Sequence, residues 1–288
     1  MSASGDAVRP PVLLLGQGGM LWRAWRQQLD EADIACHSPD LSQLDFTVAR
    51  TVDAAFATRF GTVINCAAWT DVDRAEAHEP EAYVLNATGP AMLANQCARS
   101  GALLVHYSTD YVFNGRASRP YAVDAPIEPA NAYGRTKAAG EKLIADSGCR
   151  HLIIRTSGLY APWGRNFVRT MARLMNARPV LRVVDDQTTR VTSAEYLAAA
   201  SMKLTAGGAA GTYHVAGGGT CSWCEFAQAI AQLLKSGCQI QPCTTAEYPT
   251  PATRPPYSVL DLSKAEMLIG PTPDWRAQLE DVVRRLEN

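Results

Sequence analysis

Tyr133 and Lys137 lie four residues apart in the segment Tyr133-Gly-Arg-Thr-Lys137. On a helix this spacing puts both side chains on one face, so that an ammonium group can sit beneath a phenol and favour its ionised form. A phenol, with an ordinary pKa of about 10, needs such help to exchange protons near neutral pH. A hydroxyl at the end of the preceding strand-like run, from Ser108 or Thr109, would hold a substrate carbonyl against the phenol. The spacing is also common on solvated helix surfaces, so its meaning depends on the rest of the chain.

A glycine-rich turn near the start of the chain gives the second chemical signal. The apolar run of residues 12–15 is followed by Gly16-Gln-Gly-Gly19 and then by a helix-like stretch over residues 21–29. Glycines let the backbone approach a pyrophosphate, and the following helix offers N–H groups and the positive end of its dipole. The third glycine of the usual fingerprint is replaced by Trp22, and a glycine turn without a ligand is the alternative. Together with the Tyr/Lys pair, the turn predicts a nicotinamide nucleotide.

The elements that must position these residues alternate along the first half of the chain. Expected strands are residues 12–15, 62–66, 103–108 and 151–156, and expected helices are residues 21–29, 52–59, 87–100 and 136–147. Continuous apolar runs are typical of strands that are buried on both faces of a parallel sheet. The pattern predicts a doubly wound α/β fold. After residue 157 the alternation falters, with a loop over 161–166, a helix over 167–175 and a surface turn over 206–211.

Composition restricts the class of protein. A chain of 288 residues can bury a large core as one domain, or as a Rossmann unit with a smaller partner domain. Its net charge is −1, which gives no electrostatic footprint for nucleic acid or for an anionic membrane. Residues 1–11 contain no apolar signal core, and no apolar run approaches the roughly 20 residues that span a bilayer. We therefore expect a cytoplasmic protein.

Eight cysteines raise the question of disulfides or a metal site. They are scattered through strand-like and helical stretches of a chain without a secretion signal, which favours reduced thiols. Cys221-Ser-Trp-Cys224, followed by Cys238 and Cys243, has zinc-like spacing in its first half. The same segment also has the pattern of a helix start, with Cys221 or Ser222 as the cap, and we favour this interpretation over a zinc site. No metal is expected.

Longer motifs carry a resemblance to a known family over nearly the whole chain. The most specific are Asn65-Cys-Ala-Ala-Trp-Thr-Asp-Val-Asp73, His106-Tyr-Ser-Thr-Asp-Tyr-Val-Phe113, Asn131-Ala-Tyr-Gly-Arg-Thr-Lys-Ala-Ala-Gly-Glu141 and Ile154-Arg-Thr-Ser157. In these residues the chain resembles the extended short-chain dehydrogenase/reductase superfamily and, within it, the dTDP-4-dehydrorhamnose reductase family of nucleotide-sugar 4-ketoreductases. The resemblance implies an NAD(P)-binding Rossmann domain over residues 8–157 and 186–217. The smaller substrate-binding lobe would comprise residues 158–185 and 218–288.

The resemblance also implies a mechanism, the reduction of the 4-keto group of a nucleotide-activated 6-deoxyhexulose. Tyr133 would give its proton to the forming alkoxide, and Thr109 would hydrogen-bond that oxygen as charge develops. Lys137 would bind the nicotinamide ribose and tune Tyr133. The residues expected to contact the cofactor are Gly16, Gly19, Met20, Leu21, Asp45, Phe46, Ala67, Ala68, Thr70, Tyr107, Tyr133 and Lys137.

A second set of residues is expected to contact the substrate. It comprises Ser108, Thr109, Asp110, Gly158, Asn166 and Arg254. Arg254 would pair with the diphosphate, since a guanidinium matches phosphate oxygens, and Asn166 would either face phosphate or cap its helix. The choice of cofactor should depend on residues 35–38, where neither an acidic residue nor an arginine stands. His37 and Ser38 could tolerate a 2'-phosphate, so NADPH is expected, with NADH possible.

Departures from the family pattern leave alternatives open. Gly158 stands where the rhamnose-forming reductases place a Trp that packs on the sugar, so the hexose or the product, for instance a 6-deoxytalose, could differ. Ala24 occupies the place of one acidic magnesium ligand at the dimer contact, which leaves metal dependence and a homodimer open. A second class of function is a non-catalytic regulatory subunit. The methionine adenosyltransferase beta subunit shares these motifs and acts by binding a partner protein.

Overall fold

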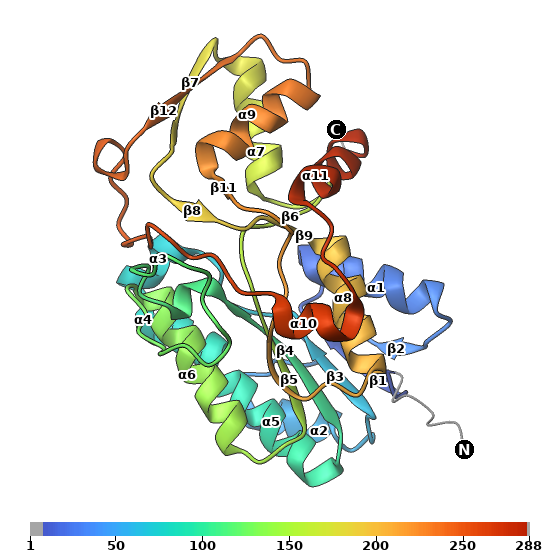
Figure 1. Ribbon diagram of the computed structural model, residues 1–288. Helices are drawn as coiled ribbons and strands as arrows, with labels where there is room; N and C mark the ends of the chain where they lie inside the picture. Colours follow the sequence, from blue (N-terminus) through green and yellow to red (C-terminus); the bar gives the residue numbers. More distant parts are fainter. Residues whose placement is uncertain (1–7, 287–288) are drawn as a thin grey trace.

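The computed structural model describes residues 8–286 and shows a parallel sheet covered by helices, with a second group of helices and short strands at one end (Figure 1). Six parallel strands form the sheet in the order β10-β5-β4-β3-β1-β2. These strands are β1 (Val12–Leu15), β2 (Cys36–His37), β3 (Thr62–Asn65), β4 (Leu103–Thr109), β5 (His151–Thr156) and β10 (Gly211–His214). The predicted doubly wound α/β fold is confirmed. Most of the stretch 1–11, in which no signal core was predicted, lies outside the described residues.

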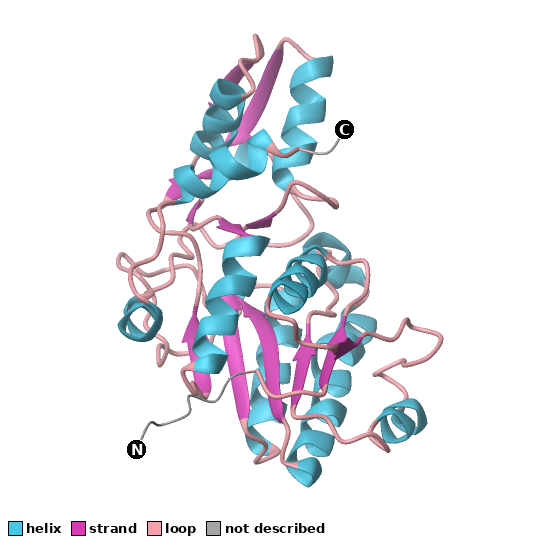
Figure 2. Cartoon of the chain, turned by 90° about the vertical axis from the view of Figure 1, so that its right-hand side faces the viewer, coloured by secondary structure: helices cyan, strands magenta, loops and turns pink. Residues whose placement is uncertain are grey.

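The sheet is buried because helices cover both of its faces (Figure 2). Every residue of β1, β3 and β4 is buried, as the continuous apolar runs predicted. On one face, α1 (Met20–Glu31) packs beside α8 (Ala194–Ala206), and Trp25 joins the cluster that contains Val105. On the other face, α5 (Gly89–Ser100) packs beside α6 (Ala132–Asp146), and Leu93 joins the cluster that contains Leu104. Successive residues of β4 thus point into opposite layers.

Helix α6 begins earlier than the sequence pattern predicted, at residue 132 instead of 136. Its N-cap is Asn131, whose side-chain oxygen accepts the backbone N–H of Gly134 at 2.8 Å. Gly140 lets the helix approach its neighbours, because a Cβ there would lie 2.0 Å from the backbone oxygen of Asn86. Both members of the Tyr/Lys pair therefore lie inside a helix that is fixed at its start and in its middle.

Shorter helices complete this part of the chain. They are α2 (Ala49–Ala55), α3 (Val72–Ala77), α4 (Glu79–Tyr83) and a π-helical turn (Val84–Thr88) that leads into α5. Helix α2 covers residues 49–55, whereas the pattern predicted 52–59. The expected helix 87–100 is confirmed from residue 89 onward as α5.

The lobe at the end of the sheet has its own core. Helices α7 (Phe167–Ala177), α9 (Trp223–Leu233) and α11 (Trp275–Arg284) enclose a cluster around Phe226 and Trp275, beside the strands β7 (Val180–Val184) and β12 (Gln239–Cys243). Two short pairs lie between lobe and sheet. They are β6 (Leu159–Tyr160) with β9 (Thr192–Ser193), and β8 (Thr188–Thr189) with β11 (Cys221–Ser222).

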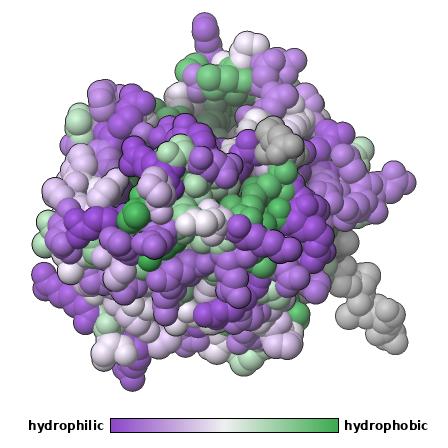
Figure 3. All heavy atoms as spheres, turned by 90° about the horizontal axis from the view of Figure 1, so that it is seen from above, coloured by the Kyte–Doolittle hydropathy of each residue, from purple (hydrophilic) through white to green (hydrophobic). Residues whose placement is uncertain are grey.

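Helix α10 (Ser263–Ile269) returns from the lobe to the sheet unit, although the predicted division assigned it to the lobe. It packs against α8 and β10, and the ammonium group of Lys264 donates to the backbone oxygen of Thr212 at 2.8 Å. Within residues 8–286, no helix is long and apolar enough to cross a membrane. Seen from above the lobe, the surface is mostly hydrophilic, with hydrophobic side chains gathered in a few patches (Figure 3).

Trp22 occupies the place of the third glycine and fastens α1 to the end of β2. Its indole N–H donates to the Ser38 hydroxyl at 2.7 Å, and that hydroxyl donates to the Leu14 carbonyl at 3.0 Å. The indole also packs on the core.

We expect Trp22→Gly to lower the free energy of unfolding by about 2–3 kcal/mol, because packing is lost and a glycine is introduced inside a helix. NADPH affinity should change by less than about tenfold. Urea unfolding and calorimetry measure both; a stable variant that has lost NADPH binding would contradict this role.

Candidate active site

A large cleft is lined by residues at the carboxyl ends of β1, β3 and β4 and by residues of the lobe. In open α/β sheets this edge is the usual ligand site, because the strand ends leave a crevice there. The cleft is lined by most of the residues predicted for cofactor and substrate: Gly16, Gly19, Met20, Leu21, Phe46, Ala67, Ala68, Thr70, Tyr107, Ser108, Thr109, Asp110, Tyr133, Lys137, Gly158 and Arg254. Residues more than 200 positions apart thus share one cavity.

The glycine turn forms one end of the cleft. Gly16 has φ +98°, and a Cβ there would lie 2.8 Å from the backbone nitrogen of Ala67, at the end of β3. Only glycine fits both the backbone angle and this close approach. Gly19 is the N-cap of α1, and its N–H donates to the Gly16 carbonyl at 3.0 Å. The first N–H groups of α1 therefore open onto the cleft, as an anionic pyrophosphate requires.

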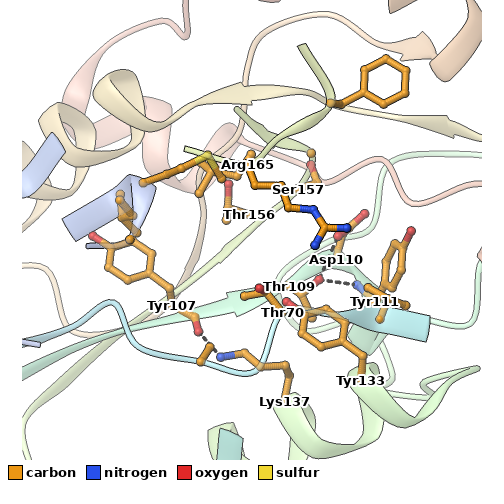
Figure 4. A pocket seen from close by; sticks show the side chains of 18 of the residues that line it. Thr70, Tyr107, Thr109, Asp110, Tyr111, Tyr133, Lys137, Thr156, Ser157 and Arg165 are labelled. Carbon is orange, nitrogen blue, oxygen red and sulfur yellow. Dashed lines mark hydrogen bonds between the residues drawn. The ribbon is translucent and has the colours of Figure 1, made fainter. Parts of the chain in front are cut away.

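The central part of the cleft carries Tyr133 with Thr109 (Figure 4). Burial raises the pKa of Tyr133 to about 12, and a hydrogen bond with the Thr109 side chain opposes that rise. The phenol is therefore protonated at neutral pH. Such a group is a proton donor, which suits a reaction that ends with an alkoxide taking up a proton.

Lys137 lies one turn after Tyr133 on α6 and also lines the cleft. It is buried, its ammonium group donates to the Tyr107 carbonyl on β4, and Nζ lies 3.4 Å from Nε2 of His106. Burial lowers the pKa of Lys137 to about 8. The tuning of the Tyr133 phenol by the Lys137 charge stays a prediction. The i, i+4 rule placed both side chains on one face, but it does not fix where a four-carbon chain points.

Thr109 and Asp110 form a second pair at the end of β4. The Thr109 hydroxyl accepts the N–H of Tyr111 at 3.1 Å and donates to Asp110 at 3.0 Å. Burial raises the pKa of Asp110 to about 6, against hydrogen bonds from Ser258 and Thr109. Ser108 also lines the cleft, and its buried hydroxyl has no hydrogen-bond partner in residues 8–286. The Thr109 hydroxyl is held beside the phenol, as the reaction would require.

Three expected contacts have other partners in the structure. Asp45 is not among the residues that line the cleft, and its carboxylate accepts the N–H and hydroxyl of Thr47 in a local turn. Asn166 takes the capping role, since its side-chain oxygen accepts the N–H of Arg169 at the start of α7. Arg254 lines the cleft but is held by both carboxylate oxygens of Asp73, at 2.8 and 3.0 Å.

Gly158 has φ +54°, and a Cβ there would lie 2.8 Å from the backbone oxygen of Arg190. A tryptophan could not replace this glycine without moving the backbone. The lobe instead brings Phe167 and Trp223 to the cleft, with their rings 4.9 Å apart. Sequence reasoning missed this aromatic wall, because both side chains resemble ordinary core residues of amphipathic helices.

Arg165 is a further cleft residue that sequence reasoning missed. It is exposed, and among the described residues it has neither a hydrogen-bond nor an ion-pair partner. Figure 4 shows its guanidinium pointing into the cleft, toward Thr109 and Asp110. Its loop is fixed, because the indole N–H of Trp163 donates to the Met20 carbonyl at 3.2 Å. A single arginine in an irregular loop has no periodicity that could have indicated this position.

The cysteines are free thiols in the structure, and six of the eight are buried. Ser222 caps α9 through a capping box with Glu225, so the helix start predicted there is confirmed with Ser222 as its cap. No group of three or more His, Cys, Asp or Glu side chains within residues 8–286 has the arrangement of a metal site. Metal independence stays a prediction.

Fold and cleft together define an NAD(P)-dependent oxidoreductase of the extended short-chain dehydrogenase/reductase class. The family model described as RmlD substrate binding domain matches residues 10–288. The dTDP-4-dehydrorhamnose reductase of Streptomyces griseus is 39% identical over 285 residues, which cover 95% of this chain and 93% of that protein. The chain belongs to the dTDP-4-dehydrorhamnose reductase family, and the resemblance seen in its motifs is confirmed.

Two further relatives support this placement. The spore coat polysaccharide biosynthesis protein SpsK of Bacillus subtilis is 38% identical over 274 residues, covering 95% of this chain and 96% of that protein. The dTDP-4-dehydrorhamnose reductase of Bacillus anthracis, solved in complex with NADP, is 35% identical. It superposes with a TM-score of 0.90 and covers 94% of this chain and 97% of that chain.

Proposed function

We propose that this protein reduces the 4-keto group of a dTDP-activated 6-deoxyhexulose with NADPH, giving a deoxysugar nucleotide for polysaccharide or glycoside synthesis. The observation that carries the proposal is one cleft that joins the glycine turn to a protonated, buried Tyr133 beside Thr109. NADPH supplies the hydride in such a reaction. The residues proposed to hold it are the glycine turn with Met20 and Leu21, the end of β3, and Lys137.

The residues of the chain act on the ketone oxygen. Tyr133 donates its proton to this oxygen as negative charge develops there. The Thr109 hydroxyl is fixed by the N–H of Tyr111, and its single hydrogen would turn from Asp110 to the same ketone oxygen. Lys137 is buried but lines the cleft, where its ammonium group would donate to a ribose hydroxyl of the cofactor.

We assign the substrate diphosphate to the cations on the cleft wall. Arg182 is paired with Glu247 and Arg254 with Asp73, so each must leave or share a carboxylate to bind a phosphate. Arg165 has no such competitor among the described residues and points into the cleft. Arg165 is therefore the proposed main diphosphate contact, with Arg254 as the second.

Replacing Arg165 tests this assignment. We expect Arg165→Gln to raise KM for the sugar nucleotide by about 10–100-fold, because a hydrogen bond to a charged group is worth about 1.5–3 kcal/mol. The KM for NADPH should change little. Arg182→Gln is the matched control, since it removes a cation from the same cleft that is already paired. An unchanged sugar-nucleotide KM in Arg165→Gln would exclude this contact, and a rise in the NADPH KM alone would assign Arg165 to the cofactor.

The function itself is tested by following NADPH oxidation with a panel of dTDP- and GDP-4-keto-6-deoxy sugars. We expect turnover with a dTDP sugar and weaker turnover with the GDP sugars. Gly158 stands where the rhamnose-forming reductases place a Trp against the sugar, so the stereochemistry of the product could differ. The product should therefore be identified by NMR. A protein that bound NADPH but reduced no member of the panel would instead support a regulatory subunit.

A further inference from the structure

Three buried polar side chains form a line beneath the cleft. Asn65 at the end of β3 and His106 on β4 are each 1% exposed, and Lys137 on α6 is 2% exposed. Nδ2 of Asn65 lies 3.2 Å from Nδ1 of His106, and Nε2 of His106 lies 3.4 Å from Nζ of Lys137. Asn65 and His106 are direct neighbours in the parallel pairing of β3 with β4. The reduction described above gives no role to Asn65 or His106.

The orientation of the Asn65 amide follows from its second bond. Its oxygen accepts the backbone N–H of Ala67 at 3.1 Å. Reversing the amide would set its NH₂ group against that N–H, donor against donor. The NH₂ group therefore faces Nδ1 of His106, and Nδ1 must offer a lone pair to accept it.

The imidazole of His106 must then carry its proton on the other nitrogen. Burial, together with the charge of Lys137, lowers the pKa of His106 well below its ordinary value, so the ring is neutral. A neutral imidazole with a lone pair on Nδ1 has its hydrogen on Nε2. That N–H faces Nζ of Lys137, which can accept it only as an amine, because an ammonium group has donors alone. The Tyr107 carbonyl accepts from Nζ in either form.

We propose that Asn65 and His106 set the protonation state of Lys137: Asn65 holds His106 as the Nε2–H tautomer, and His106 presents that N–H to Nζ. His106 and Asn65 are then positioning residues for the reduction, since they act through Lys137. The other groups that face Lys137 are the Tyr107 carbonyl on β4, and Tyr133 and Glu141 on α6. Glu141 favours the ammonium form, while burial opposes it and brings the pKa of Lys137 to about 8.

The tautomer can be observed directly and without catalysis. In the full-length protein with nitrogen-15-labelled histidine, long-range proton–nitrogen NMR separates protonated from unprotonated ring nitrogens, and His106→Gln assigns the signal by its loss. We expect an unprotonated Nδ1 and a protonated Nε2 for His106, unchanged across the pH range in which an ordinary exposed imidazole titrates. A proton on Nδ1, or a charged ring at neutral pH, would overturn the proposal. This outcome is independent of whether the protein reduces a sugar nucleotide.

The effect on Lys137 is tested by the pH dependence of kcat, and this part rests on the proposed function. Activity should fall as pH rises through about 8, where Lys137 loses its proton. His106→Met removes the N–H without adding charge, and Asn65→Asp favours the opposite tautomer by accepting from Nδ1–H. Both variants should move the alkaline limb of the profile to higher pH. We expect a shift of about one pH unit or less for His106→Met and a larger shift for Asn65→Asp.

A purely structural role would predict a different result. It would lower kcat equally at all pH values and leave the alkaline limb in place, and that result in both variants would overturn the proposal. If His106→Met does not fold, the nitrogen-15 spectrum of the unaltered protein and the Asn65→Asp profile still decide the question. A shifted limb in Asn65→Asp counts in favour only if its spectrum also shows the proton of His106 on Nδ1, because an added carboxylate alone would favour the ammonium form.

Discussion

Tyr133→Phe is expected to lower kcat for ketone reduction by about 10²–10⁴-fold, the usual contribution of a positioned general acid. The change removes one oxygen from a side chain whose ring remains packed against Tyr111, with ring centroids 6.1 Å apart. Thr109 keeps its hydrogen bonds to Asp110 and to the backbone N–H of Tyr111. The loss should therefore be confined to the proton transfer.

Two measurements separate this chemical effect from a structural one. Calorimetry should give nearly the same NADPH affinity for Tyr133→Phe as for the unaltered protein, because the glycine turn and Lys137 are untouched. Tyr196→Phe is the matched control. It removes a phenolic hydroxyl that donates to Thr272 outside the cleft, and kcat should stay within about twofold. Turnover at the unaltered rate in Tyr133→Phe would show that another group supplies the proton.

The second large effect is expected on stability, at the ion pair that joins α6 to β5. Arg155 and Glu141 are 4% and 5% exposed, and the guanidinium binds both carboxylate oxygens at 2.7 and 2.9 Å. Arg155 also donates to the Val123 carbonyl and lies over the ring of Phe113. Arg155→Met leaves the Glu141 carboxylate buried and unpaired. We expect this to lower the free energy of unfolding by about 3–5 kcal/mol.

Urea unfolding of three further variants completes this test. The double variant Arg155→Met/Glu141→Leu should recover a large part of the loss, since it removes the unpaired charge as well. Lys142→Met breaks the exposed pair with Asp146 on the same helix and should cost about 1 kcal/mol or less. Glu141→Leu alone should resemble Arg155→Met. If Arg155→Met and Lys142→Met lowered the free energy of unfolding by the same amount, the expected effect of burial on the ion pair would be contradicted.

Much of the fold could be predicted because periodicity reports burial. The strands β1, β3, β4 and β5 were predicted within a residue, since strands covered on both faces are apolar throughout. The short strand β2 was not predicted, because its two residues are not buried. The start of α6 was placed four residues late, because Tyr133 and Gly134 are weak helix formers. The Asn131 cap and the contact of Gly140 with Asn86 hold the helix there, and only the structure shows them.

The chemistry of the site was less accessible to sequence reasoning. Spacing placed Tyr133 and Lys137 on one face but could not show that the ammonium group turns toward β4. Arg254 has a side chain suited to bind phosphate, yet its guanidinium is paired with Asp73, which lies 181 residues earlier in the sequence. Arg165 has no sequence signal at all, because loop residues follow no period.

The central claim is that the ketone carbon at C4 of the sugar receives the hydride of NADPH while Tyr133 protonates its oxygen. It is tested most directly by NADPH that is deuterated at the transferred position of C4, with a dTDP-4-keto-6-deoxyhexose as substrate. The account predicts a deoxysugar nucleotide with deuterium at C4, by mass spectrometry and NMR, from the unaltered protein and almost none from Tyr133→Phe. A protein that binds both ligands but transfers no deuterium, or a Tyr133→Phe variant that transfers it at the unaltered rate, would contradict the account.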